Sequence, residues 1–285
     1  MRLEINRNKT NPKPKYMTTI DINPSTETQL NKLTAIDAQH AASNRSSKYG
    51  FISSRSIIES LTDEGFSIRK VDIQRTKDPI KLGFQRHFVR MRHSDLLPQV
   101  GDYFPEVLVM NSHDGSSKFR MTLGIFRLVC SNGMVSGSSH DEIAFSHRQI
   151  SLEAIHNGVH QLISGAGRLR EQVSKMGSRQ LTITEINEFA TNALRLRYDK
   201  PVEQEAETRE QYFRESARWN NRLATTLNTR RAEDAQNSLW NVYNRIQENL
   251  TQGAGRGSGI RRITAPLADI EINRNLWNLA EAYLN

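Results

Sequence analysis

The chain has 285 residues, a net charge of +8 and a single cysteine, and 36% of its residues are apolar. One cysteine excludes an internal disulfide and a zinc site built from cysteines, and it favours a reducing compartment. The start lacks the apolar stretch of a signal peptide and no segment approaches the roughly 18 apolar residues of a membrane-spanning helix, so we expect a cytoplasmic protein with no membrane partner.

The positive charge lies in the first 200 residues, which hold 28 basic and 20 acidic residues, whereas residues 201–285 hold 11 of each. A basic surface attracts anionic partners such as nucleic acid or a membrane surface. Many proteins of similar charge bind nothing anionic, so the charge favours a nucleic-acid partner without establishing one.

Residues 1–50 are rich in Asn, Lys, Thr, Ser and Pro, with a weak helical pattern at Leu30, Leu33 and Ile36. This composition predicts a polar N-terminal arm that is disordered or becomes ordered on a neighbour. Such an arm could clasp another subunit or be a simple tail, and the tail is the simpler expectation.

Regular structure is predicted from Ser53 onward. Ser53 and Ser54 supply hydroxyl groups that can cap a short helix, and Gly65 can end it. Residues 66–75 and 84–93 then alternate apolar and polar side chains, as strands do.

A long antiparallel hairpin is predicted over residues 105–130, with Asp114-Gly115 at its turn. Its second strand alternates, with Phe119, Met121, Leu123 and Ile125 on one face and Lys118, Arg120 and Thr122 on the other. Residues 66–130 are therefore predicted to form a meander of about four strands.

Helices follow the strands. The longest is predicted at 149–176, where apolar side chains follow one stripe. A capping box at Thr182 and Glu185 opens the next helix. The high density of charge at residues 201–222 predicts a linker or a surface helix. Apolar spacing predicts two further helices, at residues 232–250 and 272–284.

These elements predict an α+β fold, in which an antiparallel β-meander of about four strands packs on a long helix and carries a C-terminal helical extension. We expect a polar N-terminal arm at 1–50, an α+β core domain at 51–200 and a helical C-terminal extension at 201–285. In the extension, Trp240 and Trp277 occur at helical spacing from leucines, which is typical of core or subunit-contact residues.

Three blocks of sequence carry a family resemblance. They are Leu123-Gly-Ile-Phe-Arg-Leu-Val-Cys-Ser-Asn-Gly-Met134, Asn237-Ser-Leu-Trp-Asn-Val-Tyr-Asn-Arg-Ile-Gln-Glu-Asn-Leu-Thr-Gln-Gly253 and Asn273-Arg-Asn-Leu-Trp-Asn-Leu-Ala280. Together they resemble the domain of unknown function 932 family of phage and plasmid proteins, over roughly residues 50–285. The loop at 253–262 departs from the longer arginine and threonine run of that family. The resemblance implies a protein made in a bacterial host cell, but it implies no activity.

The order of helix, antiparallel strands and long helix is also similar, as a topology only, to single-strand annealing proteins of the Rad and phage recombinase type. That likeness implies a ring- or filament-forming DNA binder. A shared topology by itself is weak support for a shared function.

The predicted sheet carries the strongest candidate binding surface, which combines cationic side chains with aromatic rings on one face. Its members are Phe84, Arg86, Phe88, Arg90 and Arg92, with Lys118 and Arg120 added if their strand is a neighbour. Single-stranded nucleic acid binds such surfaces, because cations contact phosphates and rings stack on bases. Alternatively, the arginines lie on a solvent-facing sheet and pair with Asp72, Asp95 or Glu106.

Two weaker basic surfaces are candidates for phosphate contacts. The first is on the long helix and beyond it, at Arg168, Arg170, Lys175, Arg179, Arg195, Arg197 and Lys200, where a solvated face explains the residues at least as well. The second is the glycine-rich loop 253–262, whose backbone N–H groups lie beside arginines. This loop lacks the P-loop pattern, and a flexible linker is the simpler expectation.

Catalytic and metal sites have little support. His156 and His160 have the spacing of two metal ligands, but Asn157 stands where the HExxH motif needs glutamate, so we expect surface histidines. A polar loop is a simpler explanation of His140-Asp141-Glu142 and His147 than a nuclease cluster. A buried, inert thiol is likewise a simpler explanation of Cys130 than a nucleophile. We therefore predict no catalytic residue, metal or other cofactor.

The sequence leads to three hypotheses. The first is a non-enzymatic phage- or plasmid-type DNA-binding protein, a homo-oligomer that binds and anneals single-stranded DNA in recombination. The second is an oligomeric interaction protein that acts on a host factor, for example against host defence. The third, a metal-dependent nuclease, is the least supported because no acidic cluster has ligand spacing.

Overall fold

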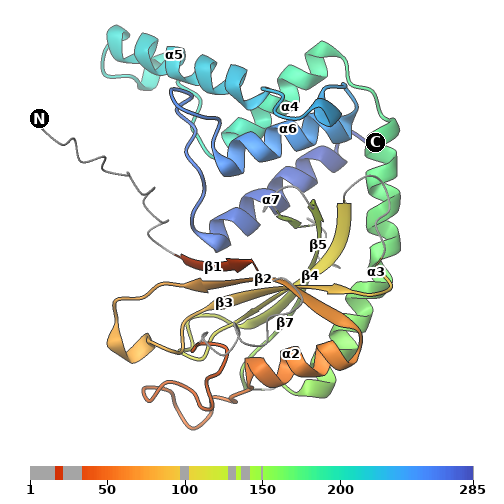
Figure 1. The fold of residues 1–285 in the computed structure, drawn as a ribbon. Coiled ribbons are helices and arrows are strands. Elements are labelled where there is room, and N and C mark those ends of the chain that lie inside the picture. The colour runs from red at the N-terminus through yellow and green to blue at the C-terminus, as the bar shows by residue number, and fades with distance from the viewer. Residues whose placement is uncertain are drawn as a thin grey trace, which may run out of the picture.

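The computed structural model describes residues 17–21, 34–96, 103–127, 133–135, 142–148 and 150–284. Within these ranges the chain forms one seven-stranded antiparallel sheet with helices on both sides (Figure 1). The strands are β1 (Met17–Asp21), β2 (Phe66–Gln74), β3 (His87–His93), β4 (Tyr103–Asn111), β5 (Phe119–Arg127), β6 (Gly133–Val135) and β7 (Glu142–Phe145). The α-helices are α2 (Ser54–Asp63), α3 (Leu152–Ser178), α4 (Ile183–Arg195), α5 (Arg209–Thr226), α6 (Leu239–Gln252) and α7 (Pro266–Glu281). None of the helices in these ranges is long and apolar enough to cross a bilayer.

The structure confirms the predicted α+β class. Strands β2 to β5 follow one another as the expected meander, each paired antiparallel with the next. Three more strands extend the sheet, because β1 pairs with β2, and β6 and β7 pair with different halves of β5. These added strands have only three to five residues, which is too short for a clear alternating pattern in the sequence.

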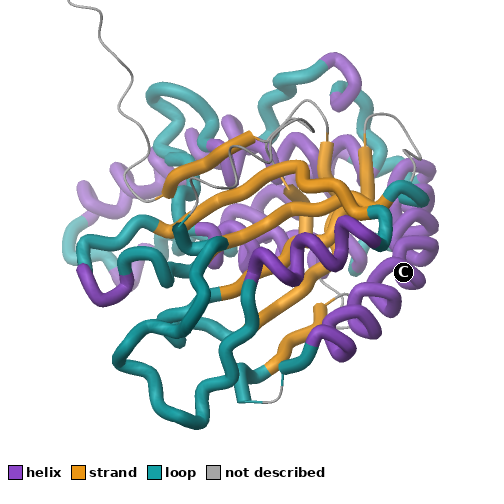
Figure 2. Tube along the Cα trace, turned by 60° about the horizontal axis from the view of Figure 1, so that its bottom comes forward, coloured by secondary structure: helices purple, strands orange, loops and turns teal. Residues whose placement is uncertain are grey.

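One face of the sheet is apolar and packs against α2 and α3. Turning the molecule shows α2 in front of the strands and the C-terminal helices behind them (Figure 2). The buried side chains of this face recur at alternate positions and include Val71, Val89, Met91, Val107, Val109, Phe119, Met121 and Leu123. Each such buried apolar side chain stabilises the fold by about 1.5–3 kcal/mol. Helix α3 comes close to this face at Gly158, where a Cβ atom would lie 2.8 Å from Met121 Cε.

The C-terminal helices lie over the other side of the sheet (Figure 1). Their aromatic centre contains Trp240 and Tyr243, whose ring centroids are 5.7 Å apart, and Trp277, which meets both rings edge-on. Both tryptophans are buried, as the sequence predicted for core residues. Helix α3 contacts both β5 and α6, so the helices after residue 200 share one hydrophobic core with the sheet.

Part of the predicted N-terminal arm also belongs to this core. Residues 17–21 form β1, and residues 34–42 contribute four buried apolar side chains, Ala35, Ile36, Ala38 and Ala42. The Ala42 N–H donates to the backbone oxygen of His113 at 2.9 Å. Most of these side chains are small, so the polar composition around them hid their packing role. Leu30 and Leu33 lie outside the described residues.

Capping signals placed several element ends correctly. Ser53 Oγ accepts the Ser56 N–H at the start of α2, and Thr182 and Glu185 form the predicted capping box of α4. The hairpin turns at Gly115, which has a φ of +71°.

Other boundaries were predicted wrongly. Helix α6 begins at Leu239 rather than near 232, because Ser238 Oγ caps it, and α7 begins at Pro266 rather than near 272. Proline suits the first turn of a helix, where its missing N–H has no partner to lose. Strand β3 begins at His87 rather than 84. Of the two alternatives for 201–222, a linker or a surface helix, the structure has a helix, α5, at Arg209–Thr226.

Candidate nucleic-acid interface

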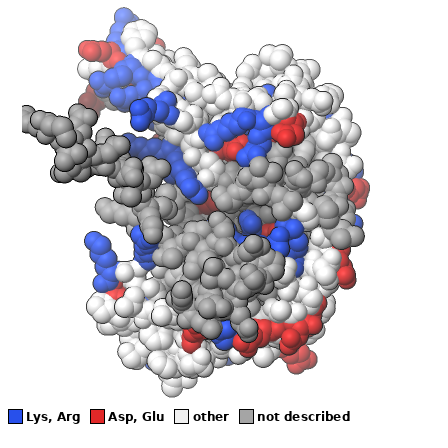
Figure 3. Space-filling view, in the orientation of Figure 1, with Lys and Arg blue, Asp and Glu red and all other residues white. Residues whose placement is uncertain are grey.

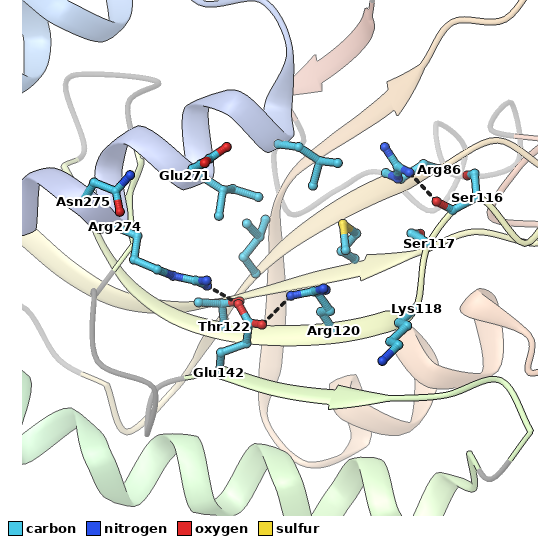
Figure 4. Close-up of a pocket in the computed structure, with 14 residues that line it drawn as sticks. Arg86, Ser116, Ser117, Lys118, Arg120, Thr122, Glu142, Glu271, Arg274 and Asn275 are labelled. Atoms are coloured by element: carbon cyan, nitrogen blue, oxygen red, sulfur yellow. Dashed lines mark hydrogen bonds and ion pairs between the residues drawn. The ribbon is translucent and has the colours of Figure 1, made fainter. Parts of the chain in front are cut away.

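A groove of about 500 Å³, the α7 groove, runs between the second face of the sheet and helix α7 (Figure 4). The sheet side is formed by the segment before β3, by β4, β5 and β7, and by the end of the hairpin. It presents Arg86, Leu108, Met110, Ser116, Ser117, Lys118, Arg120, Thr122 and Glu142. The helix side presents Leu267, Ile270, Glu271, Arg274 and Asn275. Three of the predicted binding residues, Arg86, Lys118 and Arg120, therefore lie in one groove.

Cations outnumber carboxylates in this groove. Four basic side chains (Arg86, Lys118, Arg120 and Arg274) face two acidic ones (Glu142 and Glu271). The groove is therefore a site of net positive charge into which an anionic chain would be attracted.

Glu142 joins the two sides of the groove. It pairs with Arg120 of β5 at 2.5 Å and with Arg274 of α7, as the dashed lines in Figure 4 show. Two guanidinium groups thus share one carboxylate, which leaves N–H donors of both arginines available to a second anion. The contact also fixes α7 over the sheet.

Arg86 lies at the other end of the α7 groove. Its guanidinium donates to the backbone oxygen of Ser116 at 2.6 Å, which holds the side chain against the hairpin (Figure 4). Burial lowers the pKa of Arg86, an effect that Asp114 opposes. An arginine remains charged under such shifts, so Arg86 stays a cation.

Apolar side chains lie between these cations. Leu108 and Met110 come from β4, and Leu267 and Ile270 come from the first turns of α7. Leu267 is 42% exposed, which leaves apolar surface open to the groove. The groove therefore combines positive charge with apolar walls.

Arg90 and Arg92 share this sheet face but are paired with Glu106. Glu106 is fully buried, with Oε2 2.6 Å from Arg90 Nε and Oε1 accepting from Arg92 Nε at 2.8 Å. The guanidinium of Arg92 also lies 3.5 Å from the centre of the Phe104 ring. This is the Glu106 pairing that the sequence left as an alternative. Neither arginine is among the described residues that line the α7 groove.

The two predicted stacking rings lie elsewhere too. Phe88 is only 3% exposed and pairs across the sheet with Met110. Phe84 is half-buried in the loop before β3, with its ring centroid 5.4 Å from that of His40. Neither ring is among the described residues that line the α7 groove, so the exposed apolar surface there comes from Leu108, Leu267 and Ile270.

The predicted basic residues of the long helix do not join the groove. Arg168 is exposed on α3 and Arg170 is half-buried, and neither is among the described residues lining the α7 groove. In the view of Figure 3, Lys and Arg gather over the C-terminal helices, whereas Asp and Glu form a band along the lower edge over α2. Positive charge is therefore concentrated away from α2 in this view.

The glycine-rich loop 253–262 is held in place, in contrast to the flexible linker that its composition predicted. Asn221 Nδ2 donates to the Gly257 oxygen at 2.9 Å, and Arg222 Nε donates to the Gly259 oxygen at 3.3 Å. Arg230 donates to the Gly253 oxygen. These arginines therefore bind backbone carbonyl groups of the loop, which is a structural use of their charge.

The described residues contain no group of three or more His, Cys, Asp or Glu side chains arranged to hold a metal ion. His156 Nδ1 and His160 Nε2 instead lie 2.5 Å and 3.4 Å from the carboxylate of Glu64. Of the other suggested groups, Cys130, His140 and Asp141 lie outside the described residues.

A buried polar cluster at the start of α2 had no signal in the sequence. Ser54 Oγ lies 2.7 Å from His87 Nε2 and 3.2 Å from His113 Nε2, and it accepts from Asn111 Nδ2 at 2.8 Å. Burial lowers the pKa of His87 to about 4 and that of His113 to about 3, so both are neutral at pH 7. All four residues are buried, so the cluster links α2 to β3 and β4 rather than meeting a substrate.

Comparison with known proteins places the whole groove within a recognised family. The family model of a domain of unknown function, DUF932, matches residues 41–277, a range that contains every residue lining the groove. The chain belongs to the DUF932 family. The resemblance inferred from the sequence blocks is thereby confirmed.

Two relatives of this DUF932 protein come from Escherichia coli strain K12. It is 31% identical over 248 residues to the UPF0380 protein YafZ, an alignment that covers 85% of this chain and 84% of that protein. It is 30% identical over 248 residues to the UPF0380 protein YfjQ, with the same coverage. No solved structure shows significant similarity to the DUF932 chain.

Proposed function

We propose that this protein binds single-stranded nucleic acid, DNA in the first instance, in the α7 groove. It does so as a non-enzymatic homo-oligomer that anneals strands during phage or plasmid recombination in the cytoplasm of a bacterial host. The observation that carries the proposal is a groove with four cationic side chains, two carboxylates and open aliphatic walls.

The two chemical parts of a single strand match the two parts of the groove. Arg86, Lys118, Arg120 and Arg274 supply donors for phosphates, and electrostatic attraction of this kind is independent of sequence. Leu108, Leu267 and Ile270 offer apolar surface for the faces of unpaired bases. A duplex keeps its base faces stacked inside, so the apolar walls favour a single strand.

Glu142 sets how strongly the groove attracts a strand. A phosphate that binds Arg120 or Arg274 shares these donors with the carboxylate and is repelled by its charge. Replacing Glu142 by glutamine keeps the shape and removes that charge. We expect Glu142→Gln to bind single-stranded DNA more tightly than the native protein at low salt.

The direct test is fluorescence anisotropy with labelled oligothymidylate over a series of salt concentrations. Arg120→Gln combined with Arg274→Gln is expected to weaken binding and to lower the slope of log K against log salt by about 0.7 for each phosphate that the protein no longer neutralises. Arg168→Gln combined with Arg195→Gln is the matched control, because it also removes two positive charges, from exposed arginines of α3 and α4 outside the groove. Equal losses of affinity in the two proteins would contradict the α7 groove, and circular dichroism checks that both variants are folded.

The oligomer and the annealing step need separate measurements. Light scattering is expected to give a mass of several times 32.6 kDa, and the protein is expected to speed the pairing of complementary strands. A monomer that binds DNA without annealing it would limit the function to binding. Failure to bind any nucleic acid would favour the interaction-protein hypothesis, and cleavage that needs magnesium would favour the nuclease.

A further inference from the structure

A second pocket of about 490 Å³, the hairpin pocket, lies at the tip of the β4–β5 hairpin. Segments 45–49, 115–118 and 146–148 meet there, although they are far apart in the sequence. Backbone and side-chain contacts hold them together. The Gly50 N–H donates to the His147 oxygen at 2.6 Å, and Tyr49 Oη donates to the Ser112 oxygen at 2.8 Å. The Tyr49 and His147 rings stack with centroids 4.6 Å apart, so the walls of the pocket are formed before any ligand binds.

The charge of the hairpin pocket is one-sided. Its lining contains four cations, Arg45, Lys48, Lys118 and Arg148, and four serine hydroxyl groups, those of Ser46, Ser116, Ser117 and Ser146. The described residues that line it include no carboxylate. The acidic residue of the turn, Asp114, is 7% exposed, and its Oδ1 accepts the Ser116 N–H at 2.9 Å.

This chemistry suits a phosphate monoester better than the linkages within a strand. An internal phosphodiester carries one negative charge, whereas a terminal phosphate carries about −1.5 to −2 at pH 7 and offers three strong acceptor oxygens. Several cations balance the larger charge of a terminal phosphate, and several hydroxyl groups donate hydrogen bonds to its additional acceptor oxygens. The α7 groove, in contrast, contains two carboxylates, so its net positive charge is lower than that of the hairpin pocket.

The two sites are continuous. Ser116, Ser117 and Lys118 line both the hairpin pocket and the α7 groove, so a strand that ends in one can continue into the other. We infer that the hairpin pocket binds the terminal phosphate of a single nucleic-acid strand and thereby places the strand end at the entrance to the α7 groove. This inference rests on the proposed function and adds that the protein recognises strand ends.

The test compares oligothymidylates of about 15 nucleotides, a length within the range that single-strand binding sites cover. They carry an internal label and a 5′-phosphate, a 3′-phosphate or only hydroxyl ends, and a hydroxyl-ended strand two nucleotides longer matches the added charge. Binding is measured by anisotropy at fixed salt. One phosphorylated strand is expected to bind about tenfold more tightly than both hydroxyl-ended strands, from the charge-assisted hydrogen bonds gained.

Lys48→Gln combined with Arg148→Gln should reduce this preference to about one, because it removes two exposed cations of the pocket. Arg168→Gln should keep the preference. Equal affinity of the native protein for phosphorylated and hydroxyl-ended strands would overturn the inference and leave the proposed function standing. A native protein that binds none of the strands would overturn both, and a preference that survives in the double variant would overturn the assignment to this pocket.

Discussion

The buried contact between Glu106 and two arginines of β3 leads to the sharpest prediction about stability. Glu106 is fully buried, and the side chains of Arg90 and Arg92 are 15% and 13% exposed. The Glu106→Gln substitution keeps the shape of the side chain but removes the negative charge that neutralises both guanidinium groups. Removing one partner of a buried ion pair costs about 3–5 kcal/mol. That loss is a large part of the roughly 5–15 kcal/mol by which most domains are stable.

The assay is urea unfolding at pH 7, followed by the fluorescence of the three tryptophans. Glu142→Gln is the matched control, since Glu142 also serves two arginines but is 17% exposed and its partner Arg120 is 40% exposed. Exposed pairs contribute about 1 kcal/mol or less. A loss of stability in Glu106→Gln no larger than that in Glu142→Gln would show that burial does not determine the strength of this contact.

Three further predictions concern pH and backbone conformation. Burial lowers the pKa of His87 from 6.5 to about 4 in the folded state, so its contribution to stability is complete above pH 6.5 and is lost as the pH falls towards 4. In urea unfolding at pH 7, 6 and 5, His87→Gln should reduce the fall in stability by up to about 1.4 kcal/mol per pH unit, mostly between pH 6 and pH 5, and an unchanged slope would refute this. Burial raises the pKa of Asp269 from 3.8 to about 6, against the opposing charges of Lys70 and Arg262, so the folded state becomes less stable as the pH rises from about 4 to 6. The stability of Asp269→Asn relative to the native chain should therefore increase by up to about 3 kcal/mol between pH 4 and pH 7. A constant difference in stability would contradict this. Gly253→Ala should lower the stability measured by thermal unfolding by at least about 1 kcal/mol, because Gly253 has a φ of +80° and a Cβ there would lie 2.8 Å from a backbone nitrogen. Gly167→Ala should instead raise the stability by about 1 kcal/mol, because Gly167 lies on α3 where a Cβ would meet open space.

Local sequence signals were sufficient for the elements that form by local rules. Alternation over 119–125 predicted both faces of β5, because side chains of a strand point to opposite sides of the sheet. The capping box at Thr182 and Glu185 marked the start of α4, because it satisfies backbone N–H groups within a few residues. Short strands such as β7 escaped prediction, because four residues carry too little pattern.

The candidate site was only partly predictable. Arg86, Lys118 and Arg120 were recognised because they lie at or next to β3 and β5, the two strands that flank β4 in the meander, whose pairing follows from the order of the chain. Arg274 was missed, since no local pattern says that α7 packs over this sheet face, about 150 residues further along the chain.

The sequence by itself determined the fold class, the family blocks and the side of each central strand on which its charges lie. Only the tertiary structure decided which of those charges remain available to a ligand. Glu106 neutralises Arg90 and Arg92 because it lies beside them on β4, and Glu142 pairs with both Arg120 of β5 and Arg274 of α7. Such pairings depend on distances between segments that are remote in the chain, and those distances are set when the shared core packs.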